Sequence, residues 1–195
     1  MPATLIVTSP ADSGPGTLRA ALAQATVVGI PDQIRFQPGL SEIDLTSGPL
    51  VVDRTLQIFG PSTEITIARS QAPGTPQFSV FSLVANTSLP SPPSVCLENL
   101  TITGGDSPDV GGGILDQVDP LTLNQCTVTG NNAGLDGGGI FSIGPAQLTI
   151  NASTISNNTS GNAGAGIAAN FLTMTSSTVS GNTTIGVGAG LSISG

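Results

Sequence analysis

The stretch Leu121-Thr-Leu-Asn-Gln-Cys-Thr-Val-Thr-Gly130 recurs three more times with the same pattern of apolar and hydroxyl residues. Its counterparts are Val95-Cys-Leu-Glu-Asn-Leu-Thr-Ile-Thr-Gly104, Leu148-Thr-Ile-Asn-Ala-Ser-Thr-Ile-Ser-Asn157 and Leu172-Thr-Met-Thr-Ser-Ser-Thr-Val-Ser-Gly181. The four copies begin 26, 27 and 24 residues apart. A period in the twenties is typical of a solenoid, in which each unit buries its apolar face only by stacking on its neighbours. The sequence therefore predicts one continuous stack of coils.

Alternation of apolar residues inside each copy predicts short strands with one face turned inward. A glycine-rich turn then leads to a further apolar position, as in Gly137-Gly-Gly-Ile140. Stacked coils pair equivalent strands in parallel and align like residues into interior ladders. The expected ladders are Leu97, Leu123, Ile150 and Met174, and Ile102, Val128, Ile155 and Val179. Between them, the drift from Leu100 and Cys126 to Ser153 and Ser177 predicts a bend where the interior narrows.

The fold class that follows is all-β, a right-handed parallel β-helix of about six coils with a short N-terminal capping helix. The helix is expected over Thr17–Ala25, with Leu18 and Leu22 on its apolar side, because its composition favours helix. One domain spans 1–195, with a cap region over 1–33, irregular coils over 34–94 and regular coils over 95–195. The proline-rich stretches Gln71–Gln77 and Ser88–Ser94 are expected to be loops, because proline cannot donate to an internal ladder.

Three groups of residues resemble one family of bacterial proteins. They are Ala11-Asp-Ser-Gly-Pro-Gly-Thr-Leu-Arg-Ala-Ala-Leu22, Ile43-Asp-Leu-Thr-Ser-Gly-Pro-Leu50 and the repeated Gly-Gly-Gly-Ile and Leu-Thr-Ile units. They look like bacterial surface proteins with right-handed parallel β-helices, including polymorphic outer membrane protein-type repeats and proteins with a Cys-Ser-Leu-Arg-Glu-Ala motif. Here Thr17 stands for the serine, Ala20 stands for the glutamate, and the cysteine is absent. The resemblance implies export, a pectin-lyase-like fold and a role in adhesion or the cell envelope, without a catalytic residue set.

Charge is scarce and of one sign. The chain has four basic residues, all arginine and none after Arg69, against twelve acids, which gives a net charge of −8. Such a chain cannot neutralise phosphates, so we expect no nucleic-acid partner. No apolar run approaches the length of a membrane span, so we expect no membrane insertion. Residues 1–7 lack the features of a signal peptide, so an exported form would need a leader from elsewhere.

The clearest surface pattern is a pair of outward hydroxyls on the second strand of each copy. The eight residues are Thr101, Thr103, Thr127, Thr129, Thr154, Ser156, Thr178 and Ser180. Stacking should align them into two columns on a flat, uncharged face. Regular Thr-x-Thr arrays on solenoids order water in several ice-binding proteins, so ice binding is one alternative. Threonine is also a good strand former, so the columns are compatible with a surface of no special function.

Acidic side chains offer weak candidates for a calcium site. Asp106, Asp109 and Asp136, with Asp116 and Asp119, lie in or near turns between Thr103 and Ile140. Calcium prefers carboxylate and carbonyl oxygens, but the spacing matches neither an EF-hand nor the Gly-Gly-x-Gly-x-Asp calcium repeat, so solvated turn acids are the preferred interpretation. We therefore expect no cofactor.

Polar and sulfur-containing residues near the corners have simpler explanations. Asn131, Asn157, Asn158 and Asn182 follow the second strands and are expected to stabilise turns by hydrogen bonding along the stack. Cys96 is expected to point outward and Cys126 inward, which makes a disulfide between them unfavourable.

The function expected from these observations is that of a non-enzymatic structural or adhesive β-helix, extracellular or at the cell surface. A polysaccharide lyase or hydrolase is a second alternative, but Glu98 is alone on its face, where its equivalents are Asn124, Asn151 and Thr175. Leu191–Gly195 begins another coil with nothing to cover its strand edge. We therefore expect either a longer solenoid or copies stacked end to end, with surface glycans or proteins as the other partners.

Overall fold

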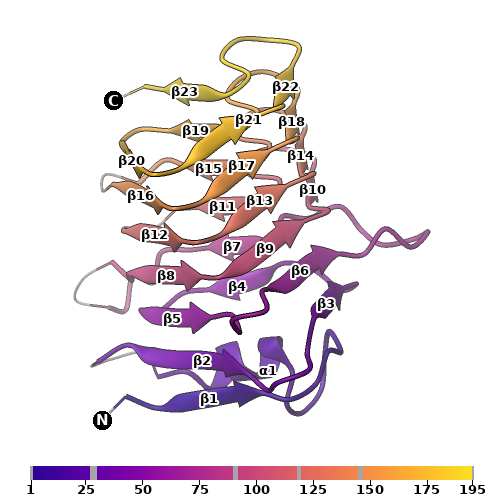
Figure 1. Ribbon diagram of the computed structural model, residues 1–195, viewed down its shortest axis with the longest axis vertical. Helices are drawn as coiled ribbons and strands as arrows, with labels where there is room; N and C mark the ends of the chain where they lie inside the picture. The colour runs from indigo at the N-terminus through magenta and orange to yellow at the C-terminus, as the bar shows by residue number, and fades with distance from the viewer. Residues whose placement is uncertain (1, 27–29, 90–91, 118–119, 145–146, 195) are drawn as a thin grey trace.

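Alternating apolar residues build a parallel β-solenoid of about seven coils, described by a computed structural model (Figure 1). The structure describes residues 2–26, 30–89, 92–117, 120–144 and 147–194. In each regular coil the chain passes through a strand of the first sheet, one of the second, one of a short sheet and one of the third. Neighbouring strands within every sheet are parallel, because each coil repeats the path of the coil before it.

Four sheets run along the stack. The first contains β1 (Thr4–Val7), β2 (Asp32–Phe36), β5 (Leu56–Phe59), β8 (Val95–Glu98), β12 (Leu121–Asn124), β16 (Leu148–Asn151) and β20 (Leu172–Thr175). The second contains β3 (Glu42–Leu45), β6 (Ile65–Arg69), β9 (Leu100–Thr103), β13 (Thr127–Thr129), β17 (Thr154–Ser156) and β21 (Thr178–Ser180). The third contains β4 (Leu50–Val52), β7 (Phe81–Leu83), β11 (Ile114–Asp116), β15 (Ile140–Ser142), β19 (Ile167–Ala169) and β23 (Leu191–Ile193). The short sheet contains β10 (Asp106–Ser107), β14 (Asn132–Ala133), β18 (Thr159–Ser160) and β22 (Thr183–Thr184).

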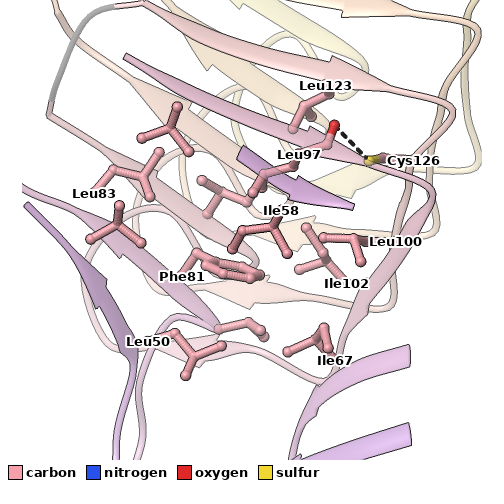
Figure 2. Close-up of a cluster of buried hydrophobic side chains, with 14 of the residues drawn as sticks. Leu50, Ile58, Ile67, Phe81, Leu83, Leu97, Leu100, Ile102, Leu123 and Cys126 are labelled. Atoms are coloured by element: carbon pink, nitrogen blue, oxygen red, sulfur yellow. Dashed lines mark hydrogen bonds between the residues drawn. The ribbon is translucent and has the colours of Figure 1, made fainter. Parts of the chain in front are cut away.

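Both predicted interior ladders are confirmed. Leu123 pairs in register with Leu97 and Ile150, and Ile150 pairs with Met174. In the second sheet Val128 stands between Ile102 and Ile155, and Ile155 pairs with Val179. Figure 2 shows how side chains from all three main sheets, labelled there as Ile58, Leu97, Ile67, Ile102, Phe81 and Leu83, fill one continuous core. Hydrophobic burial along these ladders is the main stabilising contribution to the stack.

The predicted bend lies between the first and second sheets. Left-handed residues turn the chain there, with φ of 55° at Asn99, 53° at Gln125 and 49° at Ala152. Ser153 and Ser177, in the position after the left-handed residue, form hydrogen bonds to the backbone of the neighbouring coil. Ser153 Oγ accepts from Cys126 N at 3.0 Å, and Ser177 Oγ accepts from Ser153 N at 3.1 Å. Hydroxyls therefore satisfy backbone groups at this corner, which an apolar residue cannot do.

The corner after the second sheet is held by a buried asparagine ladder. Asn131 and Asn158 are 1% and 0% exposed. Asn158 Nδ2 donates to the carbonyl of Val128 in the preceding coil at 3.0 Å, and Asn158 Oδ1 accepts from Asn131 N at 3.0 Å. Asn182 repeats this pattern toward Ile155 and Asn158. The predicted stabilising role is confirmed for these three, whereas Asn157 is an exposed left-handed residue outside the ladder.

Glycine is required at the entrance to the third sheet. Gly137 has φ of 65°, and a Cβ placed on it would lie 2.5 Å from the carbonyl oxygen of Ile140. This distance is shorter than van der Waals contact, so a larger residue would have to displace the backbone of the next strand. The same glycine recurs at Gly111 and Gly164, which explains the repeated glycine-rich turns of the sequence.

The N-terminal helix is confirmed as α1 (Leu18–Gln24), with the Thr17 side chain accepting from Ala20 N. Its buried residues include Leu18 and Leu22, and it packs against β1, β2 and β4. Both proline-rich loops are also confirmed in the described residues, between β6 and β7 and between β7 and β8. Arg69 orders the first of these loops by donating to the carbonyls of Thr75 and Pro76.

Two features of the fold differ from the prediction. The stack has about seven coils rather than six, because β1 pairs with β2 and begins a coil that α1 completes in place of further strands. The sequence also gave no indication of the short sheet, whose two-residue strands are too brief for an apolar alternation to be recognised.

The Asp12 carboxylate links the N-terminal cap to the first coils by hydrogen bonds. Asp12 Oδ1 accepts from Arg19 Nη2 at 2.6 Å, while Asp12 Oδ2 accepts from Ser47 N at 2.8 Å and Thr46 N at 3.1 Å. Burial alone would raise the pKa of Asp12, but the hydrogen bonds from Ser47, Arg19 and Thr46 together lower it to about 2. The ionised carboxylate is therefore part of the folded state.

Asp12→Asn should reduce stability by about 2 kcal/mol at pH 7, because the folded state favours the ionised form. A lowered pKa contributes stability above the unfolded value of 3.8, and that contribution is lost as pH falls from 3.8 toward about 2. Urea unfolding at pH 7, 4 and 2 should thus show the difference between wild type and variant shrinking toward zero. Asp44→Asn, an exposed change on β3, is the control. A difference that stays constant with pH would contradict this role for Asp12.

Candidate functional site

The outward hydroxyls of the second sheet form the two predicted columns. Thr127 lies in register with Thr101 and Thr154, and Thr129 with Thr103 and Ser156. The last rung adds Thr178 and Ser180. The hydroxyls of Thr129 and Ser156 are 3.2 Å apart and hydrogen-bonded. The columns contain no charged residue from β6 to β21, and they become acidic at β3, where Glu42 and Asp44 hold the equivalent positions. One carboxylate reaches the columns from beside β6, because Glu64 Oε1 accepts a hydrogen bond from Thr101 Oγ1.

A third, shorter hydroxyl column lies on the first sheet. Thr122, Thr149 and Thr173 are in register there, beside an amide pair in which Asn151 Nδ2 donates to Asn124 Oδ1 at 3.0 Å. Glu98 occupies the same column as Asn124 and Asn151. The outward faces of β8, β12, β16 and β20 therefore place one carboxylate among amides and hydroxyls, whereas glycoside hydrolysis uses two carboxyl groups.

Of the five acids considered as calcium ligands, the four that the structure describes do not converge on one point. Asp106 accepts from Asn132 and Gln77, and the hydrogen bond from Asn132 lowers its pKa. Asp136 Oδ1 accepts from Asn162 Nδ2 at 2.8 Å, and Asp109 is exposed. Asp116 is not a turn acid as expected: it points inward from β11, is 1% exposed, and accepts from Ser142 Oγ at 2.7 Å. Asp119 lies outside the described residues. Among those described, no three potential ligands of the His, Cys, Asp and Glu types gather into a metal site.

The structure places a hollow on the outer face of the third sheet that the sequence analysis did not anticipate. It has a volume of about 230 Å³ and is open to solvent. In-register outward residues change there from Phe141 on β15 to Ala168 on β19 and Ser192 on β23. The loss of side-chain volume next to Phe141 creates the hollow. The signal for the hollow lies in the glycine-rich units, where the outward residue after the inward isoleucine changes from Phe141 to Ala168.

Polar groups line both rims of this hollow. On one side Asp136 accepts a hydrogen bond from Asn162. On the other, Asn170 Nδ2 donates to the carbonyl of Ile143 at 2.9 Å and Asn170 Oδ1 accepts from Ser194 Oγ at 3.0 Å. These bonds run along the stack and fix the orientation of the amide groups.

The last described coil exposes apolar side chains that earlier coils bury. Leu191 and Ile193 occupy inward positions in register with Ile167 and Ala169, yet they are 41% and 47% exposed. In the described residues β20, β21, β22 and β23 each have a strand partner on one side only. No charged residue follows Asp136 in the sequence, so the side chains of β20, β21, β22 and β23 are all uncharged.

The two cysteines lie as predicted and are free thiols. Cys126 is buried, which raises its pKa to about 12, and its Sγ donates to the carbonyl of Leu97 at 3.4 Å (Figure 2). Burial and the neighbouring Glu98 carboxylate also raise the pKa of Cys96. Neither environment favours the thiolate that cysteine chemistry requires.

No family model, curated protein or solved structure matches the chain. The family resemblance of the sequence therefore depends on the quoted motifs alone. Among the described residues, no helix is both long and apolar enough to cross a membrane.

Proposed function

We propose that the chain is a non-enzymatic structural or adhesive β-helix of the pectin-lyase-like type that works outside the cell or at its surface. The observation that carries this proposal is the unbroken register of uncharged hydroxyls over β9, β13, β17 and β21. A rigid stack holds these groups in fixed columns, so a partner meets an ordered surface at low entropic cost. The partners proposed are surface glycans, surface proteins and a second copy of the chain.

Thr127→Lys combined with Thr154→Lys should abolish adhesion through this face, because two long charged side chains would interrupt both the flatness and the neutrality of the column. Beads coated with the purified chain would be washed over cellulose, chitin and mucin surfaces and counted. We expect at least about a tenfold loss of retained beads, equivalent to about 1.4 kcal/mol of binding free energy.

The matched control is Thr122→Lys combined with Thr149→Lys. It adds the same charges at outward positions of the neighbouring first sheet. Equal losses in both variants would show that the hydroxyl face has no special role. Retention unaffected by either pair would overturn adhesion through these sheets.

Ice binding is the second candidate, and the continuous column Thr101, Thr127, Thr154 and Thr178 favours it. The same variants separate the two functions. Thermal hysteresis in the wild type that is lost in the Thr127 and Thr154 pair, but kept in the control pair, would assign the face to ice. A wild type that shows no thermal hysteresis would exclude ice binding and leave adhesion as the proposed function.

Self-association is proposed through the last described coil, with a second copy as the occupant. The net charge of −8 resides entirely in residues 1–136, so most of the surface repels another copy. The end formed by β20–β23 lacks charge and exposes apolar side chains, while α1 packs against the opposite end. Two copies would therefore meet through the same face, as in a two-fold dimer.

Ile193→Lys should weaken this dimer at least about tenfold, because each copy would bring a cation into an apolar contact. Light scattering against concentration measures the effect, and added salt should favour the dimer by screening the repulsion between the acidic regions. Val51→Lys is the control, since Val51 is 51% exposed and lies on β4. A wild type that stays monomeric at every concentration, or an Ile193 variant that behaves like the control, would overturn this interface.

A further inference from the structure

We propose that the hollow on the third sheet is a binding site for an uncharged pyranose sugar. This inference rests on the proposed adhesive function, for which it names a ligand class and a location separate from the hydroxyl columns. The hollow extends over the outer face from β15 across β19 to β23, and its lining includes Asp136, Phe141, Ile143, Asn162, Ala168 and Asn170.

Shape is the first argument. Ala168 is only 7% exposed and lies in register beside the much larger Phe141, so it forms the floor of the hollow. The volume of about 230 Å³ lies below the range of about 300–1,000 Å³ that is common for small-ligand sites, so the hollow suits a ligand no larger than a single sugar ring. An alanine floor beside a phenylalanine wall gives an apolar surface for one face of a ring, and Ile143 extends this surface.

The hydrogen-bonding groups are the second argument. Asn162 Nδ2 donates to Asp136 Oδ1, whereas the other oxygen of each group, Asp136 Oδ2 and Asn162 Oδ1, has no hydrogen bond among the described residues. On the other rim Asn170 Nδ2 uses one of its two hydrogens for the carbonyl of Ile143. The hollow thus offers acceptors on one side and a donor on the other, all on planar groups that are already oriented. A pyranose presents the matching surface, with C–H groups on a ring face and hydroxyls at its edge.

Charge narrows the ligand class. Asp136 is the one charged group that lines the hollow within the described residues, and the sequence has no basic residue after Arg69. A carboxylate or phosphate on the ligand would meet a like charge with no cation to offset it. Neutral hexoses and N-acetylated hexosamines therefore fit the site, whereas uronic acids and sugar phosphates do not.

Protein-observed NMR titration tests the inference with methyl glucoside, methyl mannoside, methyl N-acetylglucosaminide and the anionic methyl galacturonoside. We expect at least one neutral glycoside to shift the amide signals of residues 136–143 and 162–170. The galacturonoside should bind about fivefold or more weakly, because one unscreened like charge at close range costs about that factor. Asp136→Asn keeps a side-chain acceptor for Asn162 and should remove most of this discrimination.

Ala168→Leu fills the hollow and should weaken the neutral sugar by at least about tenfold. Ser82→Leu is the matched control, because it enlarges an outward residue of the same column on β7, outside the hollow. Thermal unfolding of both variants checks that they fold. The inference is overturned if no neutral glycoside shifts these signals, or if Ala168→Leu binds like the control.

These variants leave Thr127 and Thr154 unchanged, so the bead assay reports on the proposed function separately. Intact bead adhesion without sugar binding overturns the sugar site alone. Sugar binding without bead adhesion overturns the hydroxyl face as the adhesive surface and supports the hollow in its place.

Discussion

Backbone groups at the corner after the second sheet are buried, and their hydrogen bonding is the constraint on which the regular coils depend. The side chain of Asn158 supplies a donor to the coil before it and an acceptor to Asn131, and its own backbone N–H is satisfied by Asn182. An unpaired buried donor or acceptor costs about 1–3 kcal/mol. Because each asparagine reaches back by one coil, the ladder also fixes the register of every strand between the corners.

The fixed register determines how side chains are arranged on the surface of the molecule. Side chains at equivalent positions must lie above one another, so a column takes its chemistry from whichever residues the repeats supply. Hydroxyls at successive rungs of the second sheet give a flat neutral face. The change from Phe141 to Ala168 in the third sheet gives a hollow, although the backbone there continues without interruption. Repetition of the core thus leaves surface function to substitutions that do not affect folding.

Much of the architecture was predictable from the sequence because the physical causes repeat. The ladders of Leu123 and Val128 followed from alternation, and the helix at Thr17 followed from its cap and composition. What escaped prediction occurs once or is very short. Strand β1 has no sequence counterpart in the regular coils, and the short sheet has two residues per strand.

The candidate site was predictable only in part. The two hydroxyl columns needed nothing beyond strand register, so the sequence was sufficient. The hollow depends on a size difference between Phe141 and Ala168 together with rims contributed by two different turns. The position of Asp116 was also not predictable. The sequence pattern predicts a solvent-exposed turn there, whereas Asp116 lies on β11 with its side chain in the core. The hollow and the inward position of Asp116 both depend on how neighbouring coils align. The sequence of a single coil does not contain that information.

The most direct test of this account is the stability of Asn158→Ala measured by urea unfolding, with Asn132→Ala as the exposed control on β14. The asparagine ladder predicts a loss of about 2–4 kcal/mol for the buried position, because Asn131 N and the carbonyl of Val128 both lose their partners. Hydrogen exchange should accelerate at the Asn131 amide in the same variant. A loss no larger than that of the control would contradict the claim that this ladder holds the coils in register.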